Sequence, residues 1–377
     1  MAHVEQGVRM IRHKRSILVL LVLALSLVIL AGCTTSGTQN EPKKNGGTDV
    51  KKDDAAKTMT LEVVTQWAVS RHAQVVVRAA TEEGCKNCHD GLTFTTTGGG
   101  FRARMTSSSV DASEKADAND PGTDEGGEES ARDFTVATDC RVCHMGAGAA
   151  IADKGSVDQI PSIPTAEGGL GAVCMACHNG WHPSGKNADG ELTAPHTSVQ
   201  TDMLFGVNTV DPGVESTATQ GDKESPHTKV TDTCVGCHVA GSDATNHTFR
   251  VESFEGCESK DCHDQDMTDG GTAKEDYDGD GTKEKTVVEI EGLTEALKTA
   301  IESKAGEFKS AKGQVAFTKA TSDEPTYAAA YNYFFVLKDG SRGVHNTAFT
   351  VDLLTRSIRA VGGTVGSNAS GSATTTP

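Results

Sequence analysis

Ten of the eleven cysteines in this chain of 377 residues fall into five close pairs, and a histidine directly follows every pair. Cysteines used at this density either hold a metal or cofactor, or form disulfides in an exported protein. Two residues separate the cysteines in four pairs, and four residues separate them in the fifth. The pairs are Cys85 and Cys88, Cys140 and Cys143, Cys174 and Cys177, Cys234 and Cys237, and Cys257 and Cys262.

The C-x-x-C-H pattern is the attachment signature of c-type haem. Its two thiols form thioethers with the porphyrin, and the adjacent histidine becomes the proximal ligand of the iron. Zinc ribbons and disulfides also use cysteine pairs. Neither explains a histidine after all five pairs, because only 13 residues of 377 are histidine. We therefore predict five covalently bound haems. Their predicted proximal ligands are His89, His144, His178, His238 and His263.

The remaining histidines can supply the second axial ligands. His3 and His13 lie in the N-terminal segment, which leaves six histidines for five irons. We expect His182 to be the spare one, because it lies only four residues after His178. The predicted distal ligands are His72, His196, His227, His247 and His345. Methionine is the alternative sixth ligand. The methionine candidates are Met105, Met145, Met175, Met203 and Met267.

Several motifs resemble those of multihaem c-type cytochromes of anaerobic respiratory microbes, over roughly residues 60–360. The four-residue spacing in the fifth pair resembles that of the small tetrahaem class III cytochromes. Trp67 followed by His72 resembles a helix that often precedes a first haem, and His345 with the segment after it resembles the last helix of the pentahaem nitrite reductase group. The resemblance implies a mainly α fold with extensive irregular loops, organised around a chain of covalent haems.

The resemblance implies a carrier that relays electrons between redox partners at the cell envelope, in anaerobic or extracellular respiration. Bis-histidine coordination fills both axial positions, which suits electron transfer. One alternative is a reductase of nitrite, hydroxylamine or a sulfur oxyanion with one open haem. The catalytic haem of the nitrite reductases typically has a lysine in place of the motif histidine, and that feature is absent here. A second alternative is a subunit of a cytochrome filament. The expected partners are redox proteins or an extracellular electron acceptor.

The N-terminus predicts export and lipidation. Four basic residues precede an apolar run from Ile17 to Leu30, and Leu30-Ala31-Gly32-Cys33 resembles the lipobox of bacterial lipoproteins. Cleavage before Cys33 would leave the protein anchored by acyl chains to the outer face of a membrane. Loss of four basic residues and one acid with residues 1–32 changes the formal charge from −17 to −20. This acidity argues against nucleic acid as a partner.

Composition and periodicity divide the chain into segments. Helices are predicted over 59–80, 287–304, 326–338 and 345–360, the first with Leu61, Val64, Ala68 and His72 on one face. The last helical region should supply a distal ligand through His345. The predicted segments are a signal peptide at 1–32, a flexible tether at 33–58, a haem-binding region at 59–272 with an acidic insertion at 111–133, a C-terminal helical region at 273–361, and a disordered tail at 362–377.

One further motif is independent of the cysteine pairs. Asp276, Asp278 and Asp280 match the start of an EF-hand loop, D-x-D-x-D-G. The acidic ligand expected at the twelfth position is missing, because Val287 stands there. Glu284 or Glu289 would replace it only in a loop of different shape. The motif indicates either a calcium site or an acidic turn.

Overall fold

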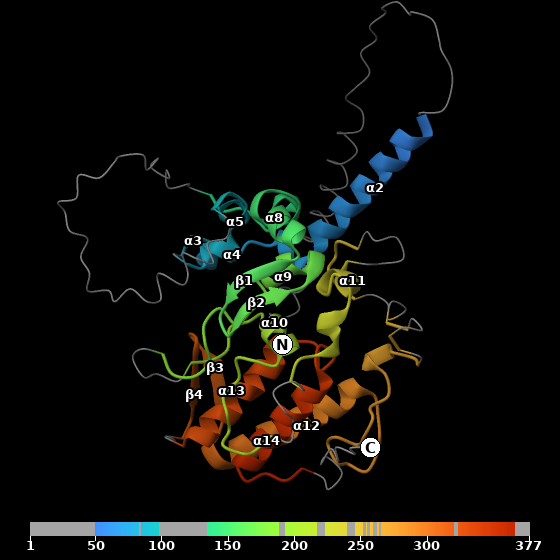
Figure 1. Cartoon of the computed structure of the whole chain (residues 1–377). Helices are drawn as coiled ribbons and strands as arrows, with labels where there is room; N and C mark the ends of the chain where they lie inside the picture. The colour runs from blue at the N-terminus through green and yellow to red at the C-terminus, as the bar shows by residue number, and fades with distance from the viewer. Residues whose placement is uncertain are drawn as a thin grey trace, which may run out of the picture. The chain divides into compact units, whose positions relative to one another are not determined.

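The structure is a computed structural model and describes most of the chain between Val50 and Val365 (Figure 1). The predicted signal peptide, the lipidation residue Cys33, Met105, the acidic insertion at 111–133 and residues 366–377 lie outside the described residues. The chain divides into two units, Met1–Ala56 and Lys57–Pro377, and only the second is described at length. The described ranges are 50–82, 84–97, 134–187, 193–216, 223–239, 246–251, 254, 257–258, 262–263, 265–319 and 323–365.

About half of the described residues are helical, which is compatible with the mainly α prediction, and two antiparallel hairpins are also present. Short helices and loops predominate up to residue 272. The elements of this part are α2 (Val50–Val69), η1 (Arg71–Ala73), α3 (Val77–Thr81), α4 (Lys86–His89), α5 (Gly91–Thr97), α7 (Cys140–His144), α8 (Gly146–Lys154), β1 (Ser156–Ile160), β2 (Ile163–Glu167), η3 (Gly169–Gly171), α9 (Ala172–Met175), α10 (Gln200–Phe205), η5 (Pro226–Lys229), α11 (Cys234–His238) and η6 (Thr268–Gly270).

Three longer helices form the C-terminal part and pack against one another (Figure 1). They are α12 (Thr286–Ala305), α13 (Glu324–Asp339) and α14 (Thr347–Ala360), with a hairpin of β3 (Phe308–Ala311) and β4 (Gln314–Phe317) between the first two. These bounds confirm the three helices predicted after residue 286. Their apolar stripes meet in one cluster, which includes the fully buried Leu293, Leu297, Phe335, Leu353 and Leu354.

Helix capping explains where these helices begin and end. The Asp323 carboxylate accepts from the Thr326 N–H at the start of α13, and Pro325 occupies the first turn. The helix stops at Gly340, which has the left-handed φ of 76° that glycine tolerates. The side chain of Asn346 then caps α14, and its amide donates to the carbonyls of Met203 and Lys223. These bonds hold the segment around His345 against the haem-binding region.

A second apolar cluster lies within the predicted haem-binding region. The hairpin β1–β2 pairs Val157 with Ala166 and Ile160 with Ile163, and these four residues are buried. Phe94, Val142, Met175 and Ala176 complete the buried set, and Cys143, Cys177 and Cys234 pack against it. This hairpin was not predicted, because Gly, Pro and Asp residues interrupt the short alternation of apolar and polar residues in its strands. The cluster is small, with eight buried apolar residues against nineteen in the C-terminal cluster.

The N-terminal helix differs from the prediction. α2 starts at Val50, so the last nine residues of the predicted tether are helical, which fits the Ala and Lys residues there. It ends at Val69 instead of continuing to residue 80, and His72 lies in the short turn η1. The predicted apolar face is not a core face, since Leu61 is 69% and Val64 45% exposed. Trp67 instead docks through its indole N–H, which donates to the Thr138 carbonyl at 2.9 Å.

No helix among the described residues has both the length and the apolar character that crossing a bilayer requires.

Candidate functional site

The C-x-x-C-H motifs are built on single turns of helix. Helix α7 begins at Cys140 and ends at His144, and α11 runs from Cys234 to His238. The other two motifs have the same turn, since the N–H of His89 donates to the Cys85 carbonyl and that of His178 to the Cys174 carbonyl. Residues three and four apart lie on one face of a helix. Each motif therefore presents its two thiols and its histidine on the same side.

Each motif histidine lies opposite one of the five predicted distal histidines. We call each pair, together with the two motif cysteines, a centre, and number the centres by the order of the cysteine pairs. In order, the pairs and their ring-centroid distances are His89 and His196 at 6.3 Å, His144 and His247 at 6.4 Å, His178 and His72 at 6.0 Å, His238 and His345 at 6.2 Å, and His263 and His227 at 6.2 Å.

This spacing fits two imidazoles on opposite sides of one metal ion. A metal–imidazole nitrogen bond is about 2 Å long and the nitrogen lies roughly 1 Å from the ring centre, so two trans ligands place their centroids about 6 Å apart. The planes of the two imidazole rings in a pair meet at angles from 25° to 85°. Such a range is compatible with metal ligation, because each ring can rotate about its metal–nitrogen bond.

Four of the paired histidines use Nδ1 for a hydrogen bond, which leaves Nε2 for a metal. Such outer partners orient a ligating imidazole and select its tautomer. The acceptors are the Gln200 side-chain oxygen for His178 at 3.1 Å, the Phe249 carbonyl for His238 at 3.0 Å, the His345 carbonyl for His227 at 3.3 Å, and the Asp339 carboxylate for His345 at 2.7 Å.

The electrostatics favour the neutral imidazole that metals bind. Burial lowers the pKa of His72 to about 4, with a smaller effect from the nearby His178. Burial also lowers the pKa of His89, His178, His227 and His238. His345 is the exception among these rings. Burial lowers its pKa too, but the adjacent Asp339 carboxylate outweighs this and raises the pKa overall.

The pairing does not follow the order of the sequence. His72 precedes the first cysteine pair but lies opposite the motif histidine of the third centre. His247 lies shortly before the fifth cysteine pair but opposite His144 of the second centre. Sequence reasoning had identified these histidines without assigning them to motifs. Tertiary packing brings the partners together across as many as 107 residues, as between His89 and His196.

His182 has a different environment, in line with its prediction as the spare histidine. Its ring lies 5.7 Å from that of Trp181, and within the described residues it has no ring contact with a motif histidine. Its Nδ1 is 3.1 Å from the Pro183 carbonyl. Among the methionine candidates, Met175 and Met203 are fully buried in the two apolar clusters.

Cysteines of neighbouring centres lie near one another. The sulfur of Cys174 in the third centre is hydrogen-bonded to that of Cys234 in the fourth, which raises the pKa of Cys174. Burial and the nearby Cys143 of the second centre add to this rise. Burial raises the pKa of Cys237 in the fourth centre, and the nearby Cys257 of the fifth centre raises it further. The first centre joins the third, because the Cys88 thiol lies 3.8 Å from the Ala176 carbonyl.

Glycines permit the close approach of the third and fourth centres. A Cβ atom on Gly171 would lie 2.2 Å from the Thr233 hydroxyl oxygen, a distance that no side chain could accept. The Thr233 hydroxyl donates to the Gly168 carbonyl at 2.9 Å, and the Leu170 N–H donates to Asp232 at 2.9 Å. The segments leading into the two motifs are therefore bonded side by side.

Phe249 links three centres. Its ring lies 4.5 Å from the ring of His72 in the third centre and 5.8 Å from that of His247 in the second. Its carbonyl accepts the hydrogen bond from His238 in the fourth. The sequence identifies His247 as a candidate ligand but gives no sign of the role of Phe249, which no spacing rule indicates.

Helix α10 organises the third centre. Gln200 bonds the ring of His178, the Thr201 hydroxyl donates to the His178 carbonyl at 2.6 Å, and Asp202 accepts from the Gly180 N–H at 2.6 Å. The Asp202 side chain is buried, and burial raises its pKa to about 7. These three consecutive residues hold the loop that follows the third motif.

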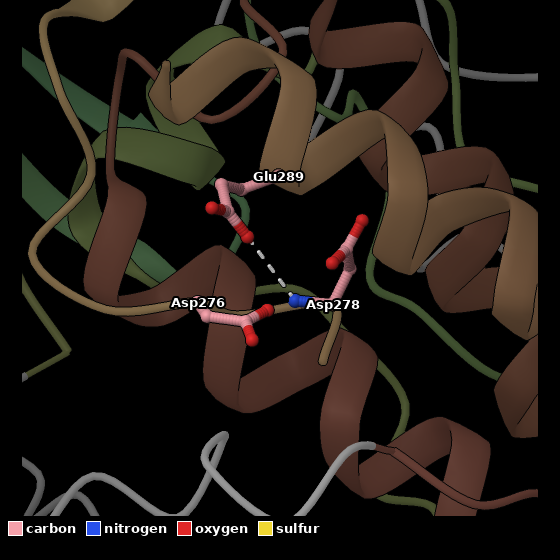
Figure 2. A group of neighbouring side chains, drawn as sticks. All are labelled: Asp276, Asp278 and Glu289. Carbon is pink, nitrogen blue, oxygen red and sulfur yellow. Dashed lines mark hydrogen bonds between the residues drawn. The ribbon is translucent and has the colours of Figure 1, made fainter. Parts of the chain in front are cut away.

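The acidic motif at residue 276 forms a closed loop against α12 (Figure 2). Carboxylate oxygens of Asp276, Asp278 and Glu289 lie within 4.8 Å of one another, whereas Asp280 groups with Asp278 and Glu284. Glu289 is fully buried, and its two oxygens accept from the N–H groups of Tyr277 at 2.7 Å and Glu284 at 2.8 Å. Glu289 thus takes a place in the loop that the missing twelfth ligand would have had, two residues further along α12.

Calcium binding at this loop stays a prediction of the sequence. If it is right, adding calcium to the haem-loaded protein should raise the melting temperature, as about 2.7 kcal/mol of stabilisation is expected at a hundredfold excess over the Kd. Calorimetry with and without a chelator measures this. The Glu289→Gln variant should lose the response, and Glu295→Gln, on an exposed part of the same helix, should keep it. An unchanged wild-type melting temperature would contradict the prediction.

The comparisons with known proteins assign this chain to no family. No family model matches the chain, and no curated protein or solved structure shows significant similarity to it. The resemblance to multihaem cytochromes therefore rests on the motifs and on the geometry described above.

Proposed function

We propose that this chain is a pentahaem c-type cytochrome that relays electrons between redox partners. The observation that carries the proposal is the pairing of each of the five motif histidines with one other histidine at 6.0–6.4 Å, while His182 is left out. Five cysteine pairs would hold the haems covalently, and ten histidines would fill the axial positions. The haems would supply the reversible one-electron couple of iron.

The protein's own groups would prepare these sites for electron transfer. Hydrogen bonds at Nδ1 keep the rings of His178, His227, His238 and His345 in place, so that little rearrangement accompanies a change of charge. The hydrogen bonds between the segments that lead into the third and fourth motifs would keep two of the cofactors close to one another. The net negative charge would stabilise ferric over ferrous iron and so lower the potentials.

The same observation favours a carrier over the two alternatives. A reductase needs one iron with an open axial position, and a filament commonly borrows a histidine from the next subunit. Here every motif histidine in the described residues has an opposing histidine within its own chain. We further propose that Cys33 anchors the exported protein to the outer face of a membrane, where its partner is a redox protein or an extracellular acceptor. The redox role belongs to anaerobic or extracellular respiration.

The test uses the full chain produced in a host that attaches c-type haem. Intact-mass spectrometry and a haemochrome assay should find five haems per chain, and low-temperature EPR with spin counting should find all of them low-spin. A count below five would overturn the pentahaem assignment. One high-spin haem in five, with turnover of nitrite, hydroxylamine or a sulfur oxyanion, would replace the carrier by the reductase. A Cys33→Ser variant should no longer be found in the membrane fraction.

A further inference from the structure

The third and fourth centres are neighbours, but their histidines have outer partners of different charge. In the third centre, Nδ1 of His178 lies 3.1 Å from the side-chain oxygen of Gln200, a neutral amide. In the fourth centre, Nδ1 of His345 lies 2.7 Å from a carboxylate oxygen of Asp339. The opposing His238 donates to the neutral carbonyl of Phe249. His345 is the one histidine, among those with a described Nδ1 partner, that bonds a carboxylate.

The two outer partners belong to one network. The Gln200 side-chain N–H donates to the backbone carbonyl of Asp339 at 2.8 Å and lies near that of Lys338 at 3.3 Å. This fixes the amide with its oxygen toward His178. The end of α13 therefore supplies the carboxylate that bonds His345 in the fourth centre. It also supplies the backbone carbonyls that orient the Gln200 amide, which bonds His178 in the third centre.

No lysine or arginine among the described residues neutralises the Asp339 charge. The residue is buried, with 3% of its surface exposed, and within the described residues its ion-pair partner is His345 alone. Its second oxygen accepts from the N–H and hydroxyl of Ser341. The ammonium of the adjacent Lys338 instead donates to the Pro195 carbonyl and the Ser310 hydroxyl. A buried carboxylate that lacks a cation acts strongly on nearby charge.

We propose that Asp339 acts through His345 to make the haem of the fourth centre harder to reduce than the adjacent haem of the third. A carboxylate that accepts the Nδ1 proton makes the imidazole a stronger electron donor, which stabilises the ferric over the ferrous state. The proposal rests on the proposed function, since it presumes the haems. An electron shared between the two haems would then reside mainly on the third, which leaves the fourth ferric.

The experiment is a spectroelectrochemical titration of the haem-loaded full chain, with EPR of the oxidised state. In Asp339→Asn, one of the five midpoint potentials should move positive and the g values of one low-spin haem should shift. Asp339→Glu, which retains the charge, should restore most of the wild-type potential. Gln200→Glu places a carboxylate on His178 and should move a different potential negative. Asp352→Asn is the control, because that carboxylate pairs with Arg356 and Ser216 and contacts no histidine.

The outcomes separate the inference from the function on which it rests. A wild-type protein without haem would overturn the proposed function itself. Five haems with potentials that neither Asp339→Asn nor Gln200→Glu shifts would overturn the inference alone. If Asp339→Asn turns one haem high-spin, Asp339 is needed to keep His345 ligated, and Gln200→Glu then decides whether an outer carboxylate lowers a potential. A shift in Asp352→Asn equal to that in Asp339→Asn would also contradict the inference.

Discussion

Replacing His72 by alanine should turn one haem in five from low-spin to high-spin in the oxidised protein. His72 is the one described ring opposite His178, at 6.0 Å, so its loss would leave that iron with a single protein ligand. The half-buried His72 ring packs on Phe249, with ring centroids 4.5 Å apart. Low-temperature EPR with spin counting, together with resonance Raman spectroscopy, measures the fraction of each spin state.

His182→Ala is the matched control for this variant. It removes a histidine that lies four residues from the same motif, yet its ring is placed beside Trp181. We expect all five haems to remain low-spin in this variant. The assignment of the pairs would be wrong if His182→Ala produced the high-spin signal and His72→Ala did not.

Without attached haem, the chain should lose the structure of residues 59–272 while the C-terminal helices persist. The predicted haem-binding region has a cluster of only eight buried apolar residues, and three of the paired cysteines pack against that cluster. The porphyrins would supply the missing apolar surface there, much as metal drives the folding of small metal-dependent domains. In the C-terminal cluster, sixteen of the nineteen buried apolar residues lie at or after Ile290.

Hydrogen exchange measured on the full chain, produced with and without haem attachment, tests this expectation. Amides of α12, α13 and α14 should stay protected in the haem-free chain, whereas those of α7, α9 and α11 should exchange freely. The matched control is the haem-loaded chain, in which all six helices should be protected. Equal protection of α9 in both preparations would show that the region folds without its cofactors.

Sequence reasoning succeeded where a signal lies within a few neighbouring residues. The C-terminal helices follow from stripes such as Leu293, Leu297 and Ile301, which recur at the helical period, and from the stop at Gly340. It failed where a signal depends on distant contacts. The sequence around Leu61 in α2 predicts a core face, but Leu61 is exposed in the part of the chain that the structure describes. The buried β1–β2 hairpin has too short an alternation of apolar and polar residues to be predicted.

The acidic motif at residue 276 also depends on contacts between residues that are distant in the sequence. Asp276 and Asp278 could be identified from their spacing, because residues two apart in one loop lie close together whatever the rest of the fold. That Glu289 closes the loop depends on how α12 packs beside it, and Gly292 makes room, since a Cβ there would lie 1.9 Å from a carboxylate oxygen of Asp278. No local pattern contains this information.

The sequence by itself determined the five cysteine pairs with their following histidines and the number of other histidines, because these patterns lie within a few neighbouring residues. It also singled out His182 as the histidine left over. Only the tertiary structure decided which histidine opposes which motif, that the third and fourth centres lie side by side, and that Asp339 bonds His345. These are contacts between residues far apart along the chain, and they depend on how the loops cross rather than on any spacing within them.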